Sequence, residues 1–368
     1  MASRSATHFN DNNEHCQYKH CQNKAKSRMM TEVSEQQTEI DDIVAKLGLA
    51  LKRRYGEGIR VDNVSIATLG ASNRTVLFDA VETAGRRRLV LRQETVKSEV
   101  SPFISPHDQF EILKVVYRHG VLVPEPIFEL EPEDDLDAGY VMACVEGETL
   151  PKVLLNAPEY VVARKRFATQ TGEIFAKLHA ISTSEVPFLE KVADSIDPLA
   201  AQISRYDAYC EYHPGLDVGI RWLENNRPKE KPRVFVHGDY RNGNVILSRN
   251  GIEAVLDWEC AHIGSAMEDF GWVCLRAWRF GNIDQPVGGF GPRDEFYRAY
   301  TSNGGQTIDE EEIRWWEIFG SLRWAVLNMM QADGHIRGVR RSLPFACCGR
   351  NTSMIEYDML MTINGQFS

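Results

Sequence analysis

No run of apolar residues in the sequence is long enough to cross a bilayer, and the first residues contain no hydrophobic signal core. Positive charge is also scarce, because 42 Lys and Arg stand against 52 Asp and Glu, a formal net charge of -10. A nucleic-acid partner would demand a basic surface, so the composition argues against one. These absences make the cytoplasm the expected location, with no membrane partner.

The sequence also lacks the cysteine pattern of a disulfide framework. Its eight cysteines are scattered and often lie within apolar runs, as Cys144 and Cys274 do, which is typical of reduced thiols. His15-Cys16 and His20-Cys21 resemble half of a zinc site, but no second pair follows at zinc-finger spacing. No structural metal is expected there.

The chain is long enough for two lobes, and the strands and helices expected in them make it an α+β protein. The chain has 368 residues with 43% hydrophobic and 26% charged residues, which is enough for a sizeable core. Its polar start has no hydrophobic period, so residues 1–35 are predicted to form a disordered tail. We expect an N-terminal nucleotide-binding lobe over 36–145 and a helical catalytic and substrate lobe over 146–368.

Hydrophobic periodicity predicts strands in the first lobe and mainly helices in the second. The expected strands of the small lobe span 63–69, 76–81, 88–92 and 140–145, with a hinge at 146–148. The expected helices span 39–54, 109–118, 163–180, 220–225, 268–278 and 311–330.

The segment from His237 to Asn244 carries the strongest chemical signal. Gly238, Asn242 and Gly243 mark it as a loop, which can turn Asp239 and Asn244 toward one point. The loop follows a short apolar strand and precedes a predicted hairpin, 245–248 with 252–256, at whose end Asp257 stands.

This arrangement fits metal-assisted phosphoryl transfer. In that chemistry a loop Asp accepts the proton of the attacking hydroxyl, while an Asn five residues later and an Asp after the next hairpin hold magnesium. Asp239 is therefore the candidate catalytic residue, and Asn244 and Asp257 are the candidate Mg²⁺ ligands. Loop-capping Asp and Asn residues are the alternative for the loop alone, and the second carboxylate in order favours the kinase interpretation.

These motifs resemble the aminoglycoside phosphotransferase family, which shares the protein-kinase-like fold. The resemblance covers about residues 60 to 365 and implies a two-lobed fold with a small antiparallel β-sheet and a mainly helical second lobe. Arg276 to Gly281 and Trp315 to Trp324 resemble a branch found near or fused to acyl-CoA dehydrogenases. Some members of that branch phosphorylate hydroxyacyl-CoA, so the resemblance suggests such an acceptor. Further matching segments are Gly70 to Thr75, Val123 to Pro126, Leu178 to Ala180, Leu256 to Glu259 and Glu268 to Phe270.

The resemblance also implies the nucleotide-binding residues. Arg92 occupies the position of the phosphate-binding Lys of protein kinases, and its guanidinium suits bidentate contact with phosphate. Gln109 stands where the acidic partner of that residue is expected, and Glu111 or Glu94 could replace it. The other candidates are Ser72 and Asn73 in the loop after the first strand, and the backbone of Ala143 and Val145 for the adenine.

Planar cations and large aromatics after the catalytic loop are the candidates for the acceptor pocket, because they could bind a carboxylate, a phosphate or a thioester-bearing chain. Packing in the core is the alternative role for aromatics at helical spacing. His237 and Asp269 are expected to be structural, Asp269 by holding the backbone of the catalytic loop. The acceptor candidates are Arg276, Trp278, Arg279, Arg323 and Trp324.

The sequence therefore predicts an ATP-dependent, Mg²⁺-assisted phosphotransferase that acts on a small-molecule hydroxyl, which we expect to belong to a hydroxyacyl-CoA or hydroxy acid. An aminoglycoside or amino-alcohol kinase is the alternative acceptor class, and a nucleotide-binding pseudokinase is the alternative without catalysis. A protein kinase is disfavoured because the long activation segment with Ala-Pro-Glu is missing after Asp257. The sequence does not specify the acceptor or the oligomeric state.

Overall fold

The structure is a computed structural model that describes residues 37–67, 73–83, 85–94, 102–339 and 341–367. The predicted tail over 1–35 and the candidate Ser72 lie outside these residues. The chain divides into two compact units, Met1–Thr95 with Leu130–Gly139, and Val96–Glu129 with Tyr140–Ser368. The lobe boundary expected at 145/146 stays a prediction.

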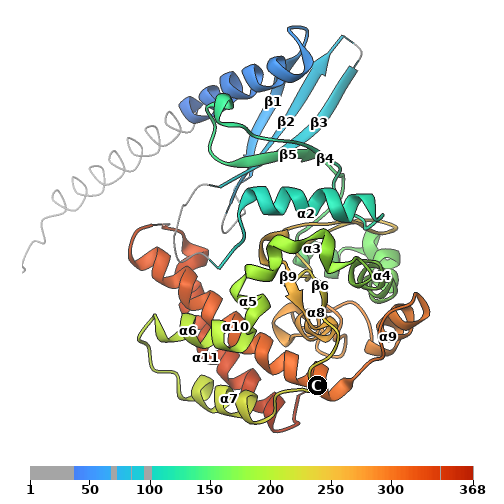
Figure 1. Cartoon of the computed structure of the whole chain (residues 1–368), viewed down its shortest axis with the longest axis vertical. Helices are drawn as coiled ribbons and strands as arrows, with labels where there is room; N and C mark the ends of the chain where they lie inside the picture. The colour runs from blue at the N-terminus through green and yellow to red at the C-terminus, as the bar shows by residue number, and fades with distance from the viewer. Residues whose placement is uncertain (1–36, 68–72, 84, 95–101, 340, 368) are drawn as a thin grey trace, which may run out of the picture. The chain divides into compact units, whose positions relative to one another are not determined.

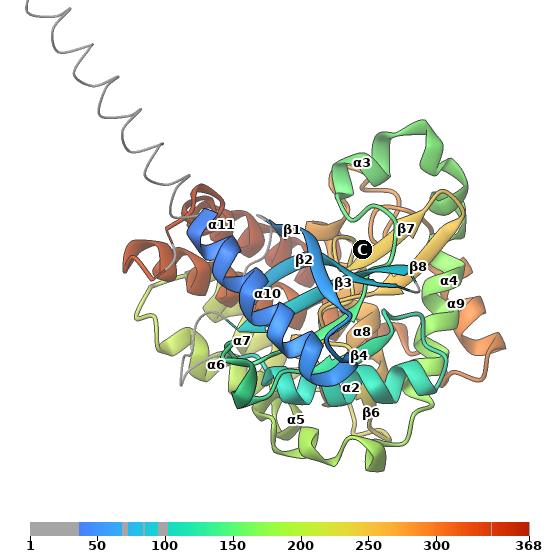
Figure 2. The same ribbon diagram turned by 90° about the horizontal axis from the view of Figure 1, so that it is seen from above.

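The first unit is built on three antiparallel strands, β1 (Arg60–Ala67), β2 (Asn73–Glu82) and β3 (Gly85–Glu94). Alternate residues of β2, such as Val76 and Phe78, are fully buried, as a sheet with one covered face requires. The helix over 37–55 lies along these strands in Figures 1 and 2, and it buries Leu47 and Leu51. The three strands and the helix match the sequence prediction within a few residues.

Two further strands complete an antiparallel sheet with the order β1-β2-β3-β5-β4. They are β4 (Pro126–Glu129) and β5 (Gly139–Ala143), which pair with each other in antiparallel register. The strand expected over 140–145 contains most of β5, but no strand was expected over 126–129, so β4 was not predicted. The sheet and the mostly helical remainder confirm the predicted α+β class.

The remaining elements belong to the second unit. Its main helices are α2 (Pro106–Arg118), α3 (Pro151–Asn156), α4 (Val161–His179), α5 (Ala193–Ile196), α6 (Pro198–Asp207), α7 (Pro214–Asn225), α8 (Ala266–Val273), α9 (Arg293–Ser302), α10 (Glu310–Ile336) and α11 (Leu343–Ile363). Its short 3-10 turns are η2 (Pro158–Tyr160), η3 (Thr183–Glu185), η4 (Pro187–Lys191), η5 (Trp258–Cys260) and η6 (Arg276–Trp278). Its strands are β6 (Val234–Val236), β7 (Val245–Ser248), β8 (Gly251–Val255) and β9 (His262–Gly264). A further 3-10 turn, η1 (Pro132–Asp134), lies in the first unit.

Close helix packing fixes the second unit around the loop between β6 and β7. Helices α10 and α11 lie side by side, as Figure 1 shows, and α8 packs on α10. A Cβ atom at Gly271 of α8 would lie only 2.6 Å from Cβ of Trp316 on α10, so the two helices approach as closely as a glycine allows. Phe175, Phe270 and Phe296 form an aromatic core beneath the loop, with Phe270 stacked on Phe296 at 4.3 Å between ring centroids.

None of the described helices combines the length and apolar character that a membrane crossing requires. Six of the eight cysteines lie in the described part of the chain, and these six form no disulfide bond. The His15-Cys16 and His20-Cys21 pairs lie outside it.

Candidate active site

The loop between β6 and β7 is held in place through its backbone. Gly238 has a φ of +74°, and a Cβ atom there would lie 2.4 Å from the carbonyl oxygen of Cys260. The carboxylate of Asp269 on α8 accepts hydrogen bonds from the backbone N–H groups of His237 and Gly238, both at 2.9 Å. The segment therefore needs a glycine at this position, and Asp269 has the contacts expected from the sequence.

Buried groups support this carboxylate. Burial by itself raises the pKa of the Asp269 carboxyl, but the hydrogen bonds from His179 and from the backbone N–H of His237 hold that pKa below its ordinary value. Burial lowers the pKa of the His237 imidazole, which is therefore neutral. Its Nδ1 accepts from the N–H of Asp239 at 3.1 Å, so its Nε2 donates to the carbonyl oxygen of Leu256 at 2.9 Å. His237 braces the loop and exchanges no proton with a substrate.

The carboxylate of Asp239 accepts three N–H donors. The Asn244 amide donates to Oδ2 at 2.7 Å, while Trp272 Nε1 and Arg241 Nε donate to Oδ1 at 2.9 and 3.2 Å. The Asp239 side chain stays 15% exposed, so a substrate can reach it. This is the geometry of a fixed carboxylate with an accessible edge.

The hairpin β7–β8 brings the second carboxylate to the loop. The backbone N–H of Leu256 donates to the carbonyl oxygen of Asn244 at 2.8 Å, so the end of the hairpin is tied to the loop. Asp257 follows in the left-handed region with a φ of +67°, a conformation that costs a non-glycine residue free energy. The structure thus brings Asp239, Asn244 and the backbone leading into Asp257 together within one unit.

The acceptor candidates fall into separate groups. Trp278 is buried between Trp272 and Trp324, with ring centroids at 5.4 and 4.8 Å, and the guanidinium of Arg241 lies over it at 4.9 Å. Arg323 is buried beside Glu268, with its guanidinium 5.0 Å from the ring centroid of Trp272. Arg323, Trp278 and Trp324 therefore belong to the surroundings of Asp239.

Arg276 begins the turn η6, and Arg279 directly follows it. Arg276 pairs with Asp358 at 3.4 Å and covers the ring of Phe367. The guanidinium of Arg279 is buried and donates to the carbonyl oxygens of Cys274 and Ile283. These contacts give Arg279 a structural role in its own loop.

The nucleotide candidates are distributed over both units. In the second unit the N–H of Ala143 donates to the carbonyl of Glu125, so Ala143 can offer a nucleotide only its carbonyl. In the first unit Arg92 of β3 donates to the hydroxyl of Thr75 at 3.1 Å, and Asn73 begins β2. Gln109, where an acid is expected, is buried and donates to the carbonyl of Ile104, while Glu111 pairs with Lys114.

Sequence patterns did not identify Trp272 and Arg241 as neighbours of the catalytic carboxylate. Arg241 lies two residues after Asp239 in the same loop, so its position in the sequence could have predicted the contact between them. Trp272 follows Asp269 by three residues, which puts both on one face of α8. That spacing could have linked Trp272 to the loop once Asp269 had been assigned to it.

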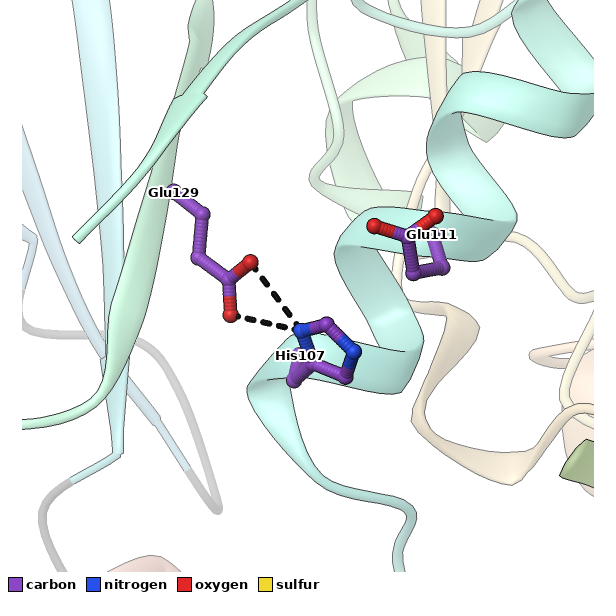
Figure 3. A group of neighbouring side chains, drawn as sticks. All are labelled: His107, Glu111 and Glu129. Carbon is purple, nitrogen blue, oxygen red and sulfur yellow. Dashed lines mark hydrogen bonds and ion pairs between the residues drawn. The ribbon is translucent and has the colours of Figure 1, made fainter. Parts of the chain in front are cut away.

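A separate cluster of His107, Glu111 and Glu129 has ligand atoms that all lie within 4.8 Å of one another (Figure 3). His107 Nδ1 contacts both carboxylate oxygens of Glu129, at 2.9 and 3.0 Å, and Glu111 already pairs with Lys114. The His107 side chain is 62% exposed, so water also solvates the group. These partners satisfy the cluster, and we assign no metal to it.

The five-stranded sheet and the helical remainder form a protein-kinase-like fold, in which Asp239, Asn244 and Asp257 are the candidate site residues. A family model described as the phosphotransferase enzyme family (APH) matches residues 64–316, more than half of the chain. The chain belongs to this family.

Individual relatives are distant. The chain is 25% identical over 225 residues to Probable acyl-CoA dehydrogenase IBR3 of Arabidopsis thaliana, covering 56% of this chain and 27% of the relative. It is 23% identical over 256 residues to acyl-CoA dehydrogenase family member 10 of Mus musculus, covering 64% of this chain and 23% of the relative. The chain thus spans about a quarter of the length of these two proteins.

The solved structures support the fold. A candidate aminoglycoside phosphotransferase from Ralstonia eutropha JMP134 superposes with a TM-score of 0.65 at 20% identity, covering 87% of this chain and 98% of that one. This likeness confirms the predicted kinase-like fold.

Proposed function

We propose that the chain transfers the terminal phosphoryl group of ATP to a hydroxyl of a hydroxyacyl thioester or hydroxy acid. The observation that carries this proposal is the accessible carboxylate of Asp239, which Asn244 fixes at 2.7 Å. Asp239 orients the acceptor hydroxyl and takes its proton as the new bond to phosphorus forms. Because little covalent chemistry falls to the protein in such a reaction, holding the groups in line supplies most of the rate.

The residues near Asp239 fit a magnesium ion. Asn244 uses its Nδ2 for Asp239, which leaves its amide oxygen as a possible ligand, and Asp257 supplies a carboxylate. Hard oxygen donors of this kind suit Mg²⁺, which keeps several waters and binds phosphates directly. Bound there, the ion would neutralise charge on the phosphate oxygens. The left-handed backbone of Asp257 supports a functional role, since strained non-glycine residues cluster at such sites.

The groups that bind the nucleotide are proposed for each unit by itself. In the second unit the carbonyl of Ala143 and the N–H of Val145 are proposed to bind the adenine edge. In the first unit Arg92 is proposed to hold phosphate oxygens, with Ser72 and Asn73 as further donors. Within the first unit the Arg92 guanidinium donates to the hydroxyl of Thr75, which is proposed to help orient it.

The acceptor is proposed to enter a hollow of the second unit beside the catalytic loop. Cys260 and Arg323 line it. The carbonyl oxygen of Cys260 lies beside Gly238, and the Arg323 guanidinium lies over the ring of Trp272, which donates to Asp239. Its other walls are Pro102, Phe103, Ile104, Val192, Asp194, Gln202, Arg205, Tyr209, Glu259, Ala261, Val326, Leu327 and Met330.

The charge of this hollow favours an acyl chain over a polyamine. Its two acids, Asp194 and Glu259, are matched by two bases, Arg205 and Arg323, so its formal charge is zero. Asp194 and Arg205 pair directly at 2.6 Å. An aminoglycoside carries several positive charges and needs unpaired acids, whereas the mainly apolar walls suit a hydrocarbon chain. The names of the two curated relatives point to the same chemistry, since both are acyl-CoA dehydrogenases by name.

The test is magnesium-dependent ADP release from ATP in the presence of hydroxyacyl-CoA thioesters, free hydroxy acids, aminoglycosides or choline-like alcohols. Stimulation by the thioesters or hydroxy acids is the expected result. Asp239→Ala should abolish turnover and keep nucleotide binding, whereas Asp257→Ala should weaken binding of the magnesium nucleotide. Asp294→Ala, at an exposed position on α9, is the matched control and should change neither.

Three outcomes would overturn the proposal. Turnover that persists in Asp239→Ala would remove the assigned catalytic carboxylate. Stimulation by aminoglycosides or choline-like alcohols alone would replace the acyl acceptor with the cationic class, and nucleotide binding without turnover for any acceptor would indicate a pseudokinase.

A further inference from the structure

One turn of α8 contacts the catalytic loop at two points. Asp269 and Trp272 are three residues apart and so lie on the same face of the helix. Asp269 accepts from the backbone N–H groups of His237 and Gly238, while Trp272 Nε1 donates to the side chain of Asp239 at 2.9 Å. The helix thus holds both the main chain and the reactive carboxylate of the loop.

The surroundings of Trp272 leave its indole N–H little freedom. The side chain is 2% exposed and packs in a cluster with Leu275 and Trp278. The guanidinium of Arg323 lies over its ring, 5.0 Å from the centroid. A cation on the face of an indole draws electron density from the ring, so it makes the N–H a stronger donor.

The donors divide unequally between the two oxygens of Asp239. An ionised carboxylate has about four lone-pair positions, two on each oxygen. Oδ1 receives Trp272 and Arg241, whereas Oδ2 receives Asn244. One position is therefore left, on Oδ2, and it is the position through which Asp239 can accept a hydrogen bond from a substrate hydroxyl.

We propose that Trp272 is a positioning residue for Asp239: its indole N–H occupies Oδ1 and thereby directs the open position of Oδ2 to the acceptor hydroxyl. This role rests on the proposed function, because it acts through Asp239. Trp272 itself touches no substrate, and its contribution lies in the orientation of the carboxylate.

Trp272→Phe separates this role from packing. Phenylalanine keeps an aromatic ring beneath Arg323 and beside Trp278 and removes the N–H. The matched control is Trp315→Phe on α10. Trp315 is 4% exposed and donates its own indole N–H to the carbonyl of Leu223 at 3.1 Å. Both variants lose one buried indole hydrogen bond, and only one of these bonds reaches Asp239.

Kinetics give the first measurement. Trp272→Phe should lower kcat by about 10- to 100-fold, because small displacements of a catalytic group cost that much, and should leave KM for ATP nearly unchanged. Trp315→Phe should leave kcat within about twofold of the wild type by the same reasoning. An equal loss in both variants, or no loss in Trp272→Phe, would overturn the proposal.

The second measurement does not depend on activity. In the nitrogen-proton spectrum of the indole groups, the resonance missing in Trp272→Phe identifies Trp272 among the seven tryptophans. Asp239→Ala should move this proton upfield and leave that of Trp315 in place, because a hydrogen bond to a carboxylate is lost only at Trp272. A Trp272 resonance that stays in place would disprove the contact. If the wild type shows no turnover with any acceptor, the proposed function fails while this spectrum still decides the hydrogen bond.

Discussion

Gly238 is the residue on which the shape of the catalytic loop depends. Its φ of +74° lies in the region that favours glycine, and the carbonyl oxygen of Cys260 fills the space where a Cβ atom would stand. Gly120, at the end of α2, has a similar φ of +71° with nothing within 4 Å of its Cβ position. Both glycines adopt a left-handed backbone conformation, but only Gly238 has a neighbouring atom close to the position of a Cβ atom.

We expect Gly238→Ala to lower the free energy of unfolding by more than Gly120→Ala does. The left-handed backbone costs an alanine about 1 to 2 kcal/mol at either position. The overlap with Cys260 should add about 1 to 3 kcal/mol at Gly238. Urea unfolding of both variants measures the difference, and equal values would mean that the contact with Cys260 is not tight. Gly238→Ala should also lose activity, because it moves Asp239.

At this scale the sequence predicted the residues whose spacing is set by chemistry. Asp239, Asn244 and Asp257 were predicted because a loop and a hairpin of fixed length can bring their oxygens together. The structure shows the contact of Asn244 with Asp239, and the roles of the three residues stay predictions. Trp272 was not, since an indole, a hydroxyl or an amide could each donate to the same carboxylate. The structural role of Arg279 was not predicted either, because backbone carbonyl groups that accept from a guanidinium produce no sequence pattern.

At the scale of elements, an ion pair joins α5 to α6. Asp194 of α5 accepts two hydrogen bonds from Arg205 of α6, at 2.9 and 2.6 Å, and one from Gln202. Burial alone raises the pKa of the Asp194 carboxyl, but the hydrogen bond from Arg205 and the nearby positive charges lower it to about 2. The carboxylate form is therefore the one that stabilises the fold.

The sign of the resulting pH dependence follows from the lowered pKa. An unfolded Asp titrates near about 3.9, so the stabilisation is complete above that pH and is lost as the pH falls toward 2. The difference in unfolding free energy between wild type and Asp194→Asn should shrink by about 2 kcal/mol across that window. Urea titrations from pH 6 to about pH 2 test this expectation.

Asp207→Asn is the control for the loss of one negative charge, because Asp207 is exposed at the end of α6. A difference between wild type and Asp194→Asn that stays constant with pH would contradict the role of the ion pair.

Elements with a strong local pattern were predicted, and those formed by packing were not. The hairpin β7–β8 consists of two short apolar runs on either side of a turn at Gly251, so the sequence predicted its position. Helix α11 contains Gly349 and Asn351 and has weak amphipathic character, so its packing along α10 stabilises it more than local preference does. Strand β4 begins at Pro126, a residue that favours a connector in isolation.

At the scale of the whole molecule, the proposed nucleotide should stabilise the folded chain. A ligand that binds only the folded state at 100 times its Kd adds about 2.7 kcal/mol to the free energy of unfolding. We expect ATP with magnesium to raise Tm by about 5 °C. Asp239→Ala should retain this shift, and Asp257→Ala should reduce it, because of these two residues Asp257 is the one proposed to bind the metal. Thermal unfolding with and without magnesium measures both, and a full shift in Asp257→Ala would contradict its assignment.

The two contacts of α8 with the catalytic loop also bear on regiochemistry. Because Asp269 fixes the backbone and Trp272 fixes the carboxylate, Asp239 cannot move along a bound substrate to find a hydroxyl. The substrate must bring the hydroxyl to Oδ2, so the length of chain between its anchoring group and that hydroxyl decides which isomer reacts. Positional isomers of one hydroxy acid should therefore differ in rate even when they bind equally well.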